Sequence, residues 1–186
     1  MHIVLETDRL TLREFTEADV DNLFELNSDP EVMRYITGGK PTPREEIRDN
    51  IIPFHLGCYE RSDGLGTWAA QARSTGEFLG WFHFRPGSGE GAELGYRLRR
   101  GAWNKGYATE GSRALIRKGF TDLGVDRVFA LTMTVNTASR RVLEKAGLTL
   151  VRTFAYEGPA AIEGSEHGEV EYALTKTEWE TRGPTR

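Results

Sequence analysis

The chain has 186 residues, which is within the usual length of one domain and enough to bury a core. Hydrophobic residues make up 38% of it and charged residues 28%, and no stretch approaches the roughly 18 consecutive apolar residues of a membrane helix. The net charge is −4, with acidic and basic residues interspersed, whereas a nucleic-acid-binding surface needs a basic patch. We therefore expect a single domain over residues 1–186 that binds neither membranes nor nucleic acid.

The single cysteine, Cys58, excludes an internal disulfide framework and a cysteine-cluster metal site. Charged residues occur within the first eight positions, which is too early for the apolar core of a signal peptide. Both observations favour a reducing, cytoplasmic setting. Metal-ligand spacing is also missing among the four histidines, so we expect no bound metal; they are His2, His55, His83 and His167.

The N-terminal part of the chain predicts one strand and two helices. Alternation of leucine with polar residues over 9–13 predicts a half-buried strand. Thr16 and Asp19 form a capping pair, which predicts a helix that reaches about Asn27. A second, short helix is expected over 32–36, and the two glycines that follow would end it.

A third helix is expected from the segment 42–58. Thr42 is its predicted N-cap, with proline in the first turn and a glutamate three residues after the cap. Apolar side chains then recur at helical spacing, which predicts one buried face that includes the cysteine. These side chains are Ile47, Ile51, Phe54 and Cys58.

The centre of the chain changes to the period of β-strands. Aromatic-rich segments at 68–72 and 78–84 flank a turn at 74–76, which predicts a hairpin. A glycine-rich loop at 86–91 precedes a third strand in this series, at 92–98. The core of the sheet is expected to contain the aromatic side chains Trp68, Phe78, Trp81, Phe82 and Phe84, and the alternative for one of them is that it lines the acceptor pocket.

The C-terminal half alternates helices and strands. Apolar positions between Ala108 and Leu123 predict an amphipathic helix. It separates the strand at 92–98 from a predicted strand at 127–135, as a crossover connection between strands does. The remaining expected elements are a helix at 137–145 that ends at Gly147 and strands at 148–154 and 170–174. The order of elements predicts an α/β (α+β) fold with a sheet of mixed direction.

The segment 100–109 connects a strand to an amphipathic helix and has the features of an anion site. The first turn of a helix leaves backbone N–H groups without partners, and the helix dipole adds partial positive charge there. The small residues Gly106 and Ala108 allow a phosphate to approach that backbone closely. We therefore predict a phosphate or pyrophosphate site; the alternative is that the glycines only end a strand and begin a helix.

Two common phosphate-binding motifs do not fit this loop. The spacing of Gly101 and Gly106 matches a P-loop, but Tyr107 and Ala108 stand where lysine and serine or threonine are needed. Without those side chains nothing reaches a terminal phosphate or binds magnesium, so NTP hydrolysis is not expected. A dinucleotide-binding fingerprint is missing as well.

Three separated segments, in this order, resemble the GNAT superfamily of acetyltransferases: ELGYRL at 93–98, WNKGYATE at 103–110 and NTASRRVLEKAGL at 136–148. Within that superfamily, TDRLTLR at 7–13 and DPEVM at 29–33 are similar to the ribosomal-protein N-terminal alanine and serine acetyltransferases. The likeness spans nearly the whole chain. It implies a twisted, mostly antiparallel sheet flanked by helices, in which the fourth and fifth strands splay apart.

The resemblance implies that acetyl-CoA is the cosubstrate and that the loop 103–108 wraps its pyrophosphate with backbone amides. The family consensus Gln/Arg-x-x-Gly-x-Gly/Ala is matched at Gly106 and Ala108, with Trp103 at the first position. Because the amides are main-chain groups, we expect the cradle to survive that substitution.

The pantetheine arm would enter the gap between the splayed strands, at 97–99 and 133–135. Asn136 would hydrogen-bond the pantetheine or the adenosine end. The cofactor-binding residues implied by the resemblance are Arg97, Leu98, Arg99, Trp103, Asn104, Lys105, Gly106, Tyr107, Ala108, Thr109, Asn136 and Ser139.

The implied reaction is attack of a neutral amine on a thioester carbonyl. An α-amino group titrates near pH ~8 and a lysine near ~10, so a base must first remove a proton. Glu93 is the candidate base, and an ion pair at the strand end is its alternative role. Ser139 is the candidate proton donor to the thiolate, and satisfying a backbone group in the first turn of a helix is its alternative. A backbone amide near 96–98 would stabilise the oxyanion.

We expect structural roles for the remaining polar side chains. His83 is expected to be a packed or surface residue of its strand. Glu163, Glu166 and His167 are expected to lie in a solvated loop, with contact to the substrate as the alternative.

These observations predict an acetyl-CoA-dependent N-acetyltransferase that acts on a primary amine. The resemblance favours a protein N-terminus as the acceptor, and a small amine such as an antibiotic, a polyamine or an amino acid is the alternative. Two further hypotheses are a non-catalytic acyl-CoA sensor and an unrelated binder of phosphate ligands. The acceptor and the oligomeric state, a homodimer included, stay open. The segments expected to shape the acceptor pocket are 33–40, 55–64 and 156–167.

Overall fold

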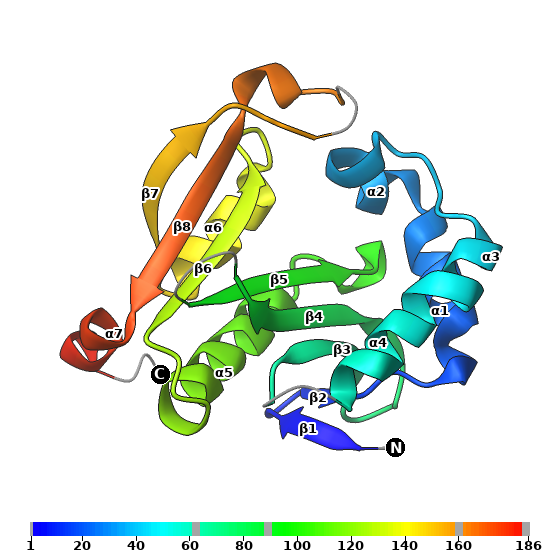
Figure 1. Cartoon of the computed structure of the whole chain (residues 1–186), viewed down its shortest axis with the longest axis horizontal. Helices are drawn as coiled ribbons and strands as arrows, with labels where there is room; N and C mark the ends of the chain where they lie inside the picture. Colours follow the sequence, from blue (N-terminus) through cyan, green and yellow to red (C-terminus); the bar gives the residue numbers. More distant parts are fainter. Residues whose placement is uncertain (1, 61–63, 88–90, 159–161, 184–186) are drawn as a thin grey trace.

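The computed structural model describes residues 2–60, 64–87, 91–158 and 162–183. Its strands are β1 (Ile3–Glu6), β2 (Leu10–Arg13), β3 (Gly66–Ala72), β4 (Phe78–Pro86), β5 (Ala92–Leu98), β6 (Arg127–Met133), β7 (Thr149–Phe154) and β8 (Glu169–Thr175). They form one sheet of order β1-β2-β3-β4-β5-β6-β8-β7 (Figure 1). All neighbouring pairs are antiparallel except β5 and β6, which are parallel. This mixed, mostly antiparallel sheet with flanking helices confirms the predicted fold class.

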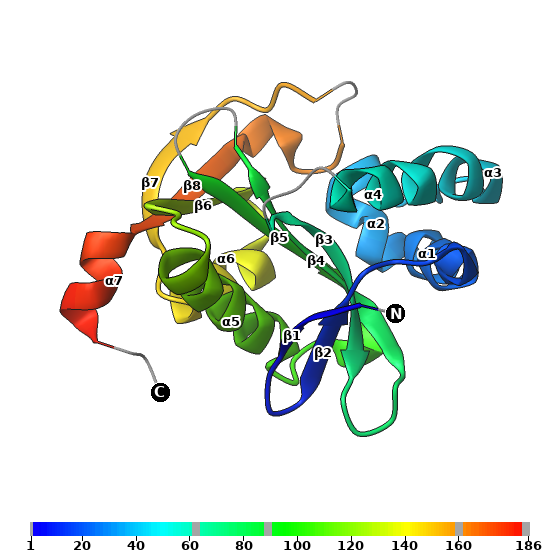
Figure 2. The ribbon, with the colours of Figure 1, turned by 60° about the horizontal axis from the view of Figure 1, so that its bottom comes forward.

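The helices lie on both faces of the sheet (Figure 2). They are α1 (Val20–Ser28), α2 (Pro30–Thr37), α3 (Arg44–Glu46), α4 (Ile52–Tyr59), α5 (Tyr107–Asp122), α6 (Thr137–Lys145) and α7 (Lys176–Arg182), with the 3-10 turns η1 (Glu17–Asp19), η3 (Arg100–Ala102) and η4 (Ser165–His167) and the π-helical turn η2 (Ile47–Ile51). Within the described ranges, no helix has the length and apolar character needed to cross a membrane.

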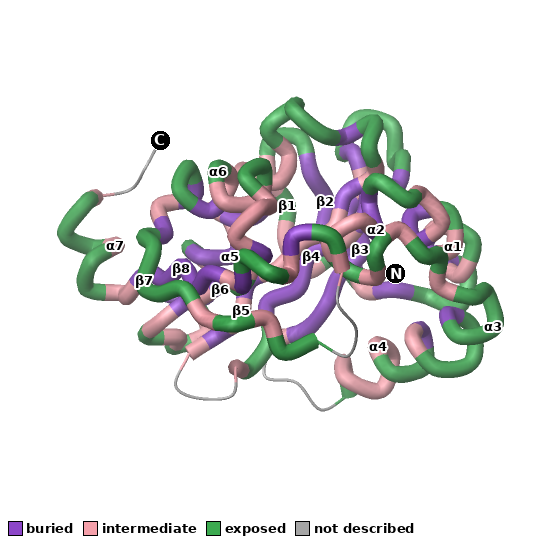
Figure 3. The backbone as a smooth tube through the Cα atoms, turned by 90° about the horizontal axis from the view of Figure 1, so that it is seen from above, coloured by how far each residue is buried: buried purple, intermediate pink, exposed green. Residues whose placement is uncertain are grey.

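Each face of the sheet has its own hydrophobic core. Phe82, Phe84 and Phe120 pack together on the face covered by α5 and α6. Phe15 and Phe78 belong to a second cluster, on the face covered by α1 to α4. The buried backbone therefore follows the central strands, while α3 and most of α7 remain exposed (Figure 3). β3 and β4 contribute side chains to both cores and are therefore packed on both faces.

A buried ion pair anchors the N-terminal strand to the first helix. All four residues of β2 are buried, so the predicted half-buried strand is wrong. Arg13 donates from Nη1 to Asp19 Oδ2 at 2.8 Å and from Nη2 to Asp19 Oδ1 at 2.7 Å. The backbone N–H of Thr16 also donates to Asp19, at 2.9 Å, which confirms the predicted capping pair. Arg13 is buried with its partner carboxylate, and alternation along the strand does not reveal this.

The third helix differs from its prediction at two places. It begins at Arg44 without a side-chain cap, so the predicted N-cap at Thr42 is wrong. The π-helical turn η2 adds a residue before α4, and this rotates the face that follows. Ile47 and Ile52 are buried as a result, whereas Phe54, which was expected in the core, is 61% exposed.

Most other predicted elements are confirmed, with ends that shift by a few residues. β3 and β4 form the expected hairpin, and α2 ends at Gly38 in the left-handed conformation, with φ of 69°. β1 and α7 were not predicted. Cys58, expected in the core, is only partly buried. Residues 88–90 of the loop predicted at 86–91 lie outside the described residues.

The parallel strands β5 and β6 start side by side and then diverge (Figure 1). Their pairing is confined to Ala92 with Val128 and Glu93 with Phe129. The remainder of both strands, all of it described, makes no bridge across the gap. The predicted splay of the fourth and fifth strands is thus confirmed for β5 and β6, and we call this arrangement the fork.

We expect Asp19→Asn to lower the free energy of unfolding by about 3 kcal/mol, because the Arg13 guanidinium would stay buried without a counter-charge. Burial tends to raise the pKa of Asp19, but hydrogen bonds from Arg13, Thr16 and Asn22 outweigh it and lower the pKa. The stabilisation is therefore present at neutral pH and is lost as the pH falls through the lowered pKa. Urea unfolding at neutral and acidic pH measures it.

The control for this experiment is Asn22→Ala, which removes one hydrogen bond to the same carboxylate and a long one, of 3.4 Å, from Arg99 but no charge, and should cost about 1 kcal/mol. The difference between wild type and Asp19→Asn should shrink on acidification. A difference of the same size at every pH would contradict the role given to the ion pair.

Candidate active site

The predicted cofactor loop is the turn between β5 and α5. Asn104 and Gly106 both have positive φ, 58° and 84°, and Gly106 is the N-cap of α5. The bond from the N–H of Glu110 to the carbonyl of Gly106, at 3.0 Å, closes the first turn of the helix. The amides of residues 107–109 precede it, and amides in this position point out of a helix N-terminus and bind anions.

Trp103 attaches the start of this loop to the strand before it. Its Nε1 donates to the carbonyl oxygen of Leu98 at 2.8 Å. The indole therefore bonds to the end of β5 and does not use the amides at the start of α5. This geometry is compatible with an amide cradle in which tryptophan replaces the consensus Gln or Arg.

The turn between β1 and β2 holds the loop from the other side. Arg9 donates from Nη1 to the carbonyl of Lys105 at 2.9 Å and from Nε to Glu110 Oε2 at 2.6 Å. Its guanidinium carbon lies 4.7 Å from the centre of the Tyr107 ring. Thr7 Oγ1 donates to Glu110 Oε1 at 2.6 Å. We call Thr7, Arg9 and Glu110 the clamp.

Sequence reasoning missed the clamp, although both of its parts lie in segments that carry the family resemblance. TDRLTLR contains Thr7 and Arg9, and WNKGYATE ends in Glu110. Their separation of about 100 positions along the chain hides the contact, which depends on β2 lying beside the start of α5.

On the opposite side of the sheet, one face of β4 and β5 carries a row of polar and aromatic side chains. Successive members are two residues apart along each strand, so they project from the same face. The directly opposed pairs of this β4–β5 row are Arg85 with Glu93, His83 with Gly95, and Trp81 with Arg97.

Glu93, the candidate base, stands where the two strands of the fork part. Its Oε2 accepts hydrogen bonds from Nε and Nη2 of Arg85, both at 3.2 Å. Its Oε1 is 3.8 Å from Nε2 of His83, which is beyond hydrogen-bonding distance, and has no hydrogen-bond partner in the described part of the chain. One oxygen thus forms the ion pair considered as an alternative, and the other can accept a proton.

His83 is buried beside this carboxylate. Its Nε2 has no hydrogen-bond partner in the described structure. Gly95 makes the space for the ring, because a Cβ there would lie 2.3 Å from Nε2. Burial, together with the charges of Arg85 and Arg97, lowers the pKa of His83 to about 3. The imidazole is therefore neutral at physiological pH, as the expected packed residue would be.

Ser139 meets the side chain of Tyr96 on the other face of β5. The two hydroxyl oxygens are 3.1 Å apart, and the Tyr96 hydroxyl also donates to the Ser139 carbonyl at 3.2 Å. Burial raises the pKa of Tyr96 to about 12, against the opposing effect of its hydrogen bond with Ser139. The phenol keeps its proton at neutral pH, so the pair has a proton to deliver. Sequence reasoning considered the hydroxyl of Ser139 but only the main chain near Tyr96.

Asn136 acts as the N-cap of α6. Its Oδ1 accepts from the backbone N–H of Ser139 at 3.2 Å. This hydrogen bond uses the side-chain oxygen and orients the first turn of the helix. Asn136, and not the Ser139 hydroxyl, therefore satisfies the backbone group of this turn, and the hydroxyl lies beside that of Tyr96.

The side chains of Arg97 and Arg99 point toward α1 and not toward the cofactor loop. Arg97 Nη1 donates to Asn27 Oδ1 at 2.6 Å, and its guanidinium lies 5.0 Å from the Trp81 ring centre. Arg99 Nη2 donates to Glu25 Oε2 at 2.7 Å. The predicted contact of these two residues with the cofactor would therefore involve their main chain.

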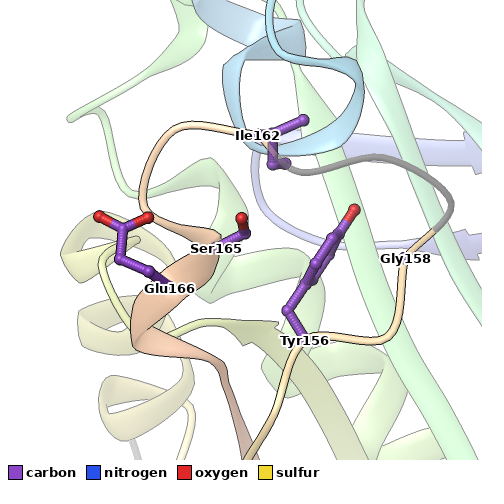
Figure 4. Close-up of a pocket in the computed structure, with 5 residues that line it drawn as sticks. All are labelled: Tyr156, Gly158, Ile162, Ser165 and Glu166. Carbon is purple, nitrogen blue, oxygen red and sulfur yellow. The ribbon is translucent and has the colours of Figure 1, made fainter.

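The segment between β7 and β8 reaches α2 across the open end of the fork (Figure 1). Arg34 Nη2 donates to Glu163 Oε1 at 3.0 Å. An open cavity of about 490 Å³ lies in this segment and is lined by Tyr156, Gly158, Ile162, Ser165 and Glu166 (Figure 4). The Tyr156 ring points toward Ile162, whereas the Glu166 carboxylate points away (Figure 4). The cavity falls within the segment 156–167 that was expected to shape the acceptor pocket.

Groups of His, Cys, Asp and Glu side chains that would suit a metal ion do not occur among the residues that the structure describes. The described chemistry at the fork consists of one carboxylate, one neutral imidazole, two hydroxyls and main-chain amides. These groups suit proton transfer and the binding of an anion.

Comparison with known proteins identifies this arrangement. A family model described as the acetyltransferase (GNAT) domain matches residues 9–149. The chain belongs to the GNAT acetyltransferase family. It is an N-acetyltransferase whose cosubstrate is acetyl-CoA, and the helix N-terminus and the fork are the features that suit such a thioester.

Relatives of this GNAT enzyme agree with the assignment. The chain is 35% identical over 184 residues to the FsC-acetyl coenzyme A-N(2)-transacetylase of Aspergillus fumigatus. The matched region covers 94% of this chain and 77% of that protein. A crystal structure of a GNAT-family acetyltransferase from Bacillus anthracis superposes with a TM-score of 0.79 at 29% identity, covering 96% of this chain and all of the other. The ribosomal L7/L12 α-N-protein acetyltransferase RimL, solved in complex with coenzyme A, has the same TM-score of 0.79 at 19% identity, with 96% and 100% coverage, which is a likeness of fold.

We expect Arg9→Met to raise the KM for acetyl-CoA about 10-fold with kcat changed less than about 3-fold, because the clamp positions the loop and does not touch the reacting atoms. Glu110→Gln should act in the same direction. Combining the two substitutions should cost less than the sum of the single effects, since the partners share one interaction.

The matched control is Arg73→Met, which removes an exposed arginine that contacts the carbonyl of Thr7 but not the loop. Steady-state kinetics at varied acetyl-CoA measures all four variants. Equal effects of Arg9→Met and Arg73→Met on the KM would show that the clamp does not position the loop.

Proposed function

We propose that this GNAT enzyme transfers the acetyl group of acetyl-CoA directly to an α-amino group. The observation that carries the proposal is the position of Glu93 at the base of the fork, with Oε1 unengaged and next to the unbridged stretch of β5. A carboxylate of this kind can accept a proton from an amine, directly or through water.

The cofactor is placed by main-chain groups. The amides of residues 107–109 bind the pyrophosphate at the start of α5, supported by the dipole of that helix. The pantetheine arm lies along the unbridged edge of β5, over residues 94–98, which brings the thioester close to Glu93 on one face and Tyr96 on the other. A free amide of that edge is the donor to the oxyanion.

Glu93 is matched to an acceptor that loses its proton easily. Near neutral pH about a tenth of α-amino groups are uncharged, against fewer than about one lysine in a thousand. A carboxylate is a weak base compared with an amine, so it removes a proton most readily from the less basic α-amino group. The relative at 35% identity is named for transfer to an N(2) nitrogen, which supports nitrogen as the accepting atom.

The leaving thiolate is protonated from the other face of the strand. The hydroxyls of Ser139 and Tyr96 are within hydrogen-bonding distance, so a proton that Ser139 gives to the thiolate is replaced by the phenol, which regains its own proton from water. Because the base and the proton donor lie on opposite faces of β5, the amine enters from the α1–α4 side and the carrier lies along the fork.

Two kinds of molecule supply such an α-amino group. One is the N-terminus of a protein, which the segments TDRLTLR and DPEVM favour through their likeness to ribosomal-protein enzymes. The other is a small amino compound, which the link between Arg34 and Glu163 favours because it spans the open end of the fork. Both acceptors would undergo the same reaction, with Glu93 as the base.

We expect Gly106→Asp to weaken coenzyme A binding about 1,000-fold, because a negative charge ~4 Å from the pyrophosphate costs about 4 kcal/mol at the effective dielectric of a protein surface. Isothermal titration with coenzyme A measures it. Gly106→Asn is the control, since it has the same shape and tolerates the left-handed backbone without the charge. Equal affinity of the aspartate and asparagine variants would argue against a pyrophosphate at this helix.

A thiol-release assay with acetyl-CoA tests the reaction. We expect turnover with peptides or amino compounds that present a free α-amino group, and little with polyamines or aminoglycosides. Glu93→Gln should lower kcat by a factor of about 100 or more and leave the KM for acetyl-CoA unchanged, because a base is lost and the binding site is not. Tight acetyl-CoA binding without turnover on any amine would favour the sensor hypothesis.

A further inference from the structure

Arg97 is an arginine without a counter-charge in the described structure. It is partly buried in the β4–β5 row, and its Nε is buried without a hydrogen-bond partner. Its contacts are one hydrogen bond to the neutral amide of Asn27 and the stack over Trp81. Burial lowers the pKa of Arg97 to about 10, so the guanidinium is still charged at neutral pH.

Two other arginines show that the missing carboxylate, and not the free Nε, distinguishes Arg97. The Nε atoms of Arg13 and Arg99 are also buried without partners. Arg13, however, is paired with Asp19, and Arg99 is paired with Glu25. Taking a charge out of water is costly unless an opposite charge is nearby. Carboxylates neutralise two of these guanidinium groups, whereas the third has no carboxylate partner among the described residues.

The position of Arg97 connects it to the reaction. It lies on the unbridged stretch of β5 and on the same face as Glu93, four residues further along the strand, or about 13 Å between Cα atoms. His83 and Trp81 fill the surface between the two, with their ring centres 5.5 Å apart. A molecule whose amine reaches Glu93 therefore lies along this row, and its other end meets Arg97.

The surroundings of the row favour an anion at that end. The positive charges of Arg85 and Arg97 both lower the pKa of His83. The carboxylate of Glu93 is paired with Arg85, so no carboxylate in the described part of the chain compensates the charge of Arg97. A guanidinium is a planar fork that matches the two oxygens of a carboxylate.

We propose that Arg97 binds a carboxylate of the acceptor, so that the substrate is a primary amine that also carries a carboxylate several bonds away. The proposal rests on the function proposed above and narrows its acceptor class. A dipeptide spans about 7 Å, and the side chains of Glu93 and Arg97 cover the rest of the distance between their strand positions. The C-terminal carboxylate of a dipeptide, or the side-chain carboxylate of an acidic amino acid, fits this span.

Matched acids and amides test the proposal. Thiol release is measured for glycyl dipeptides as free acids and as C-terminal amides, with wild type and with Arg97→Gln. We expect the substitution to lower kcat/KM for the acids about 100-fold and for the amides less than about 3-fold, because only the acids lose a charged partner. Comparing variants on the same substrate cancels the different basicities of the amines.

Two controls separate recognition from damage. The KM for acetyl-CoA and the melting temperature of Arg97→Gln should stay near those of wild type. Arg99→Gln removes a neighbouring arginine that has its own carboxylate and, whatever its effect on the rate, should leave the ratio of acid to amide unchanged. Arg97→Lys should recover part of the preference, since it restores the charge without the fork.

A binding measurement works without turnover. Trp81 lies under the guanidinium, so the N-acetylated dipeptide acid should change tryptophan fluorescence in a saturable way with wild type, but not with Arg97→Gln, and the corresponding amide with neither. Equal losses for acids and amides in Arg97→Gln, or no saturable signal with the acid, would overturn the proposal. Absence of thiol release from every amine, together with this signal, would overturn the proposed function and leave the anion site standing.

Discussion

The structure depends on one interrupted strand pairing. β5 and β6 bond to each other only at Ala92 and Glu93, and from there onward β5 has a neighbour on one edge alone. The antiparallel pairing with β4, which continues from Gly80 to Pro86, keeps the strand in place over its full length. A main chain held on one side and open on the other offers a long ligand donors and acceptors at a fixed spacing. The residues with acid–base chemistry follow from this geometry, because alternation along β5 distributes them over its two faces.

The two ends of the open strand edge are secured in different ways. At the far end, the clamp uses an ion pair and a backbone carbonyl to connect the start of α5 to the N-terminal turn. Burial tends to raise the pKa of Glu110, but hydrogen bonds from Thr7 and Arg9 outweigh it and lower the pKa, so the carboxylate stays ionised. At the start of the open edge, the pairing of Ala92 and Glu93 with β6 holds the strand in place. The first residues of the chain, within the segment TDRLTLR, therefore contribute to a site whose other motifs lie at 93–148.

Sequence reasoning identified the parts of the site that are local and missed those that need two distant segments. The loop at Gly106 is visible because a helix start has a composition of its own, and the splay of the strands was implied only by the family resemblance. Tyr96 and Ser139 lie 43 positions apart, and nothing in either segment indicates that their hydroxyls meet. The short β1 and α7 have weak patterns of their own and are stabilised by the elements beside them. The burial of Arg13 was missed because a charged residue is buried only beside an opposite charge, and the sequence alone does not identify Asp19 as that partner.

The π-helical turn before α4 has a consequence for how this chain can vary. A turn with one residue more than the α-helix can lose that residue without moving either end of the helix. After such a deletion the residues of α4 would keep their orientation, so Phe54 would stay exposed and the His55 ring would stay on Phe15, with which it stacks at 5.2 Å. A change in length of one residue in this segment is thus a route by which homologous chains can vary while the aromatic surface beside the β4–β5 row, the sheet, the fork and the cofactor loop stay the same.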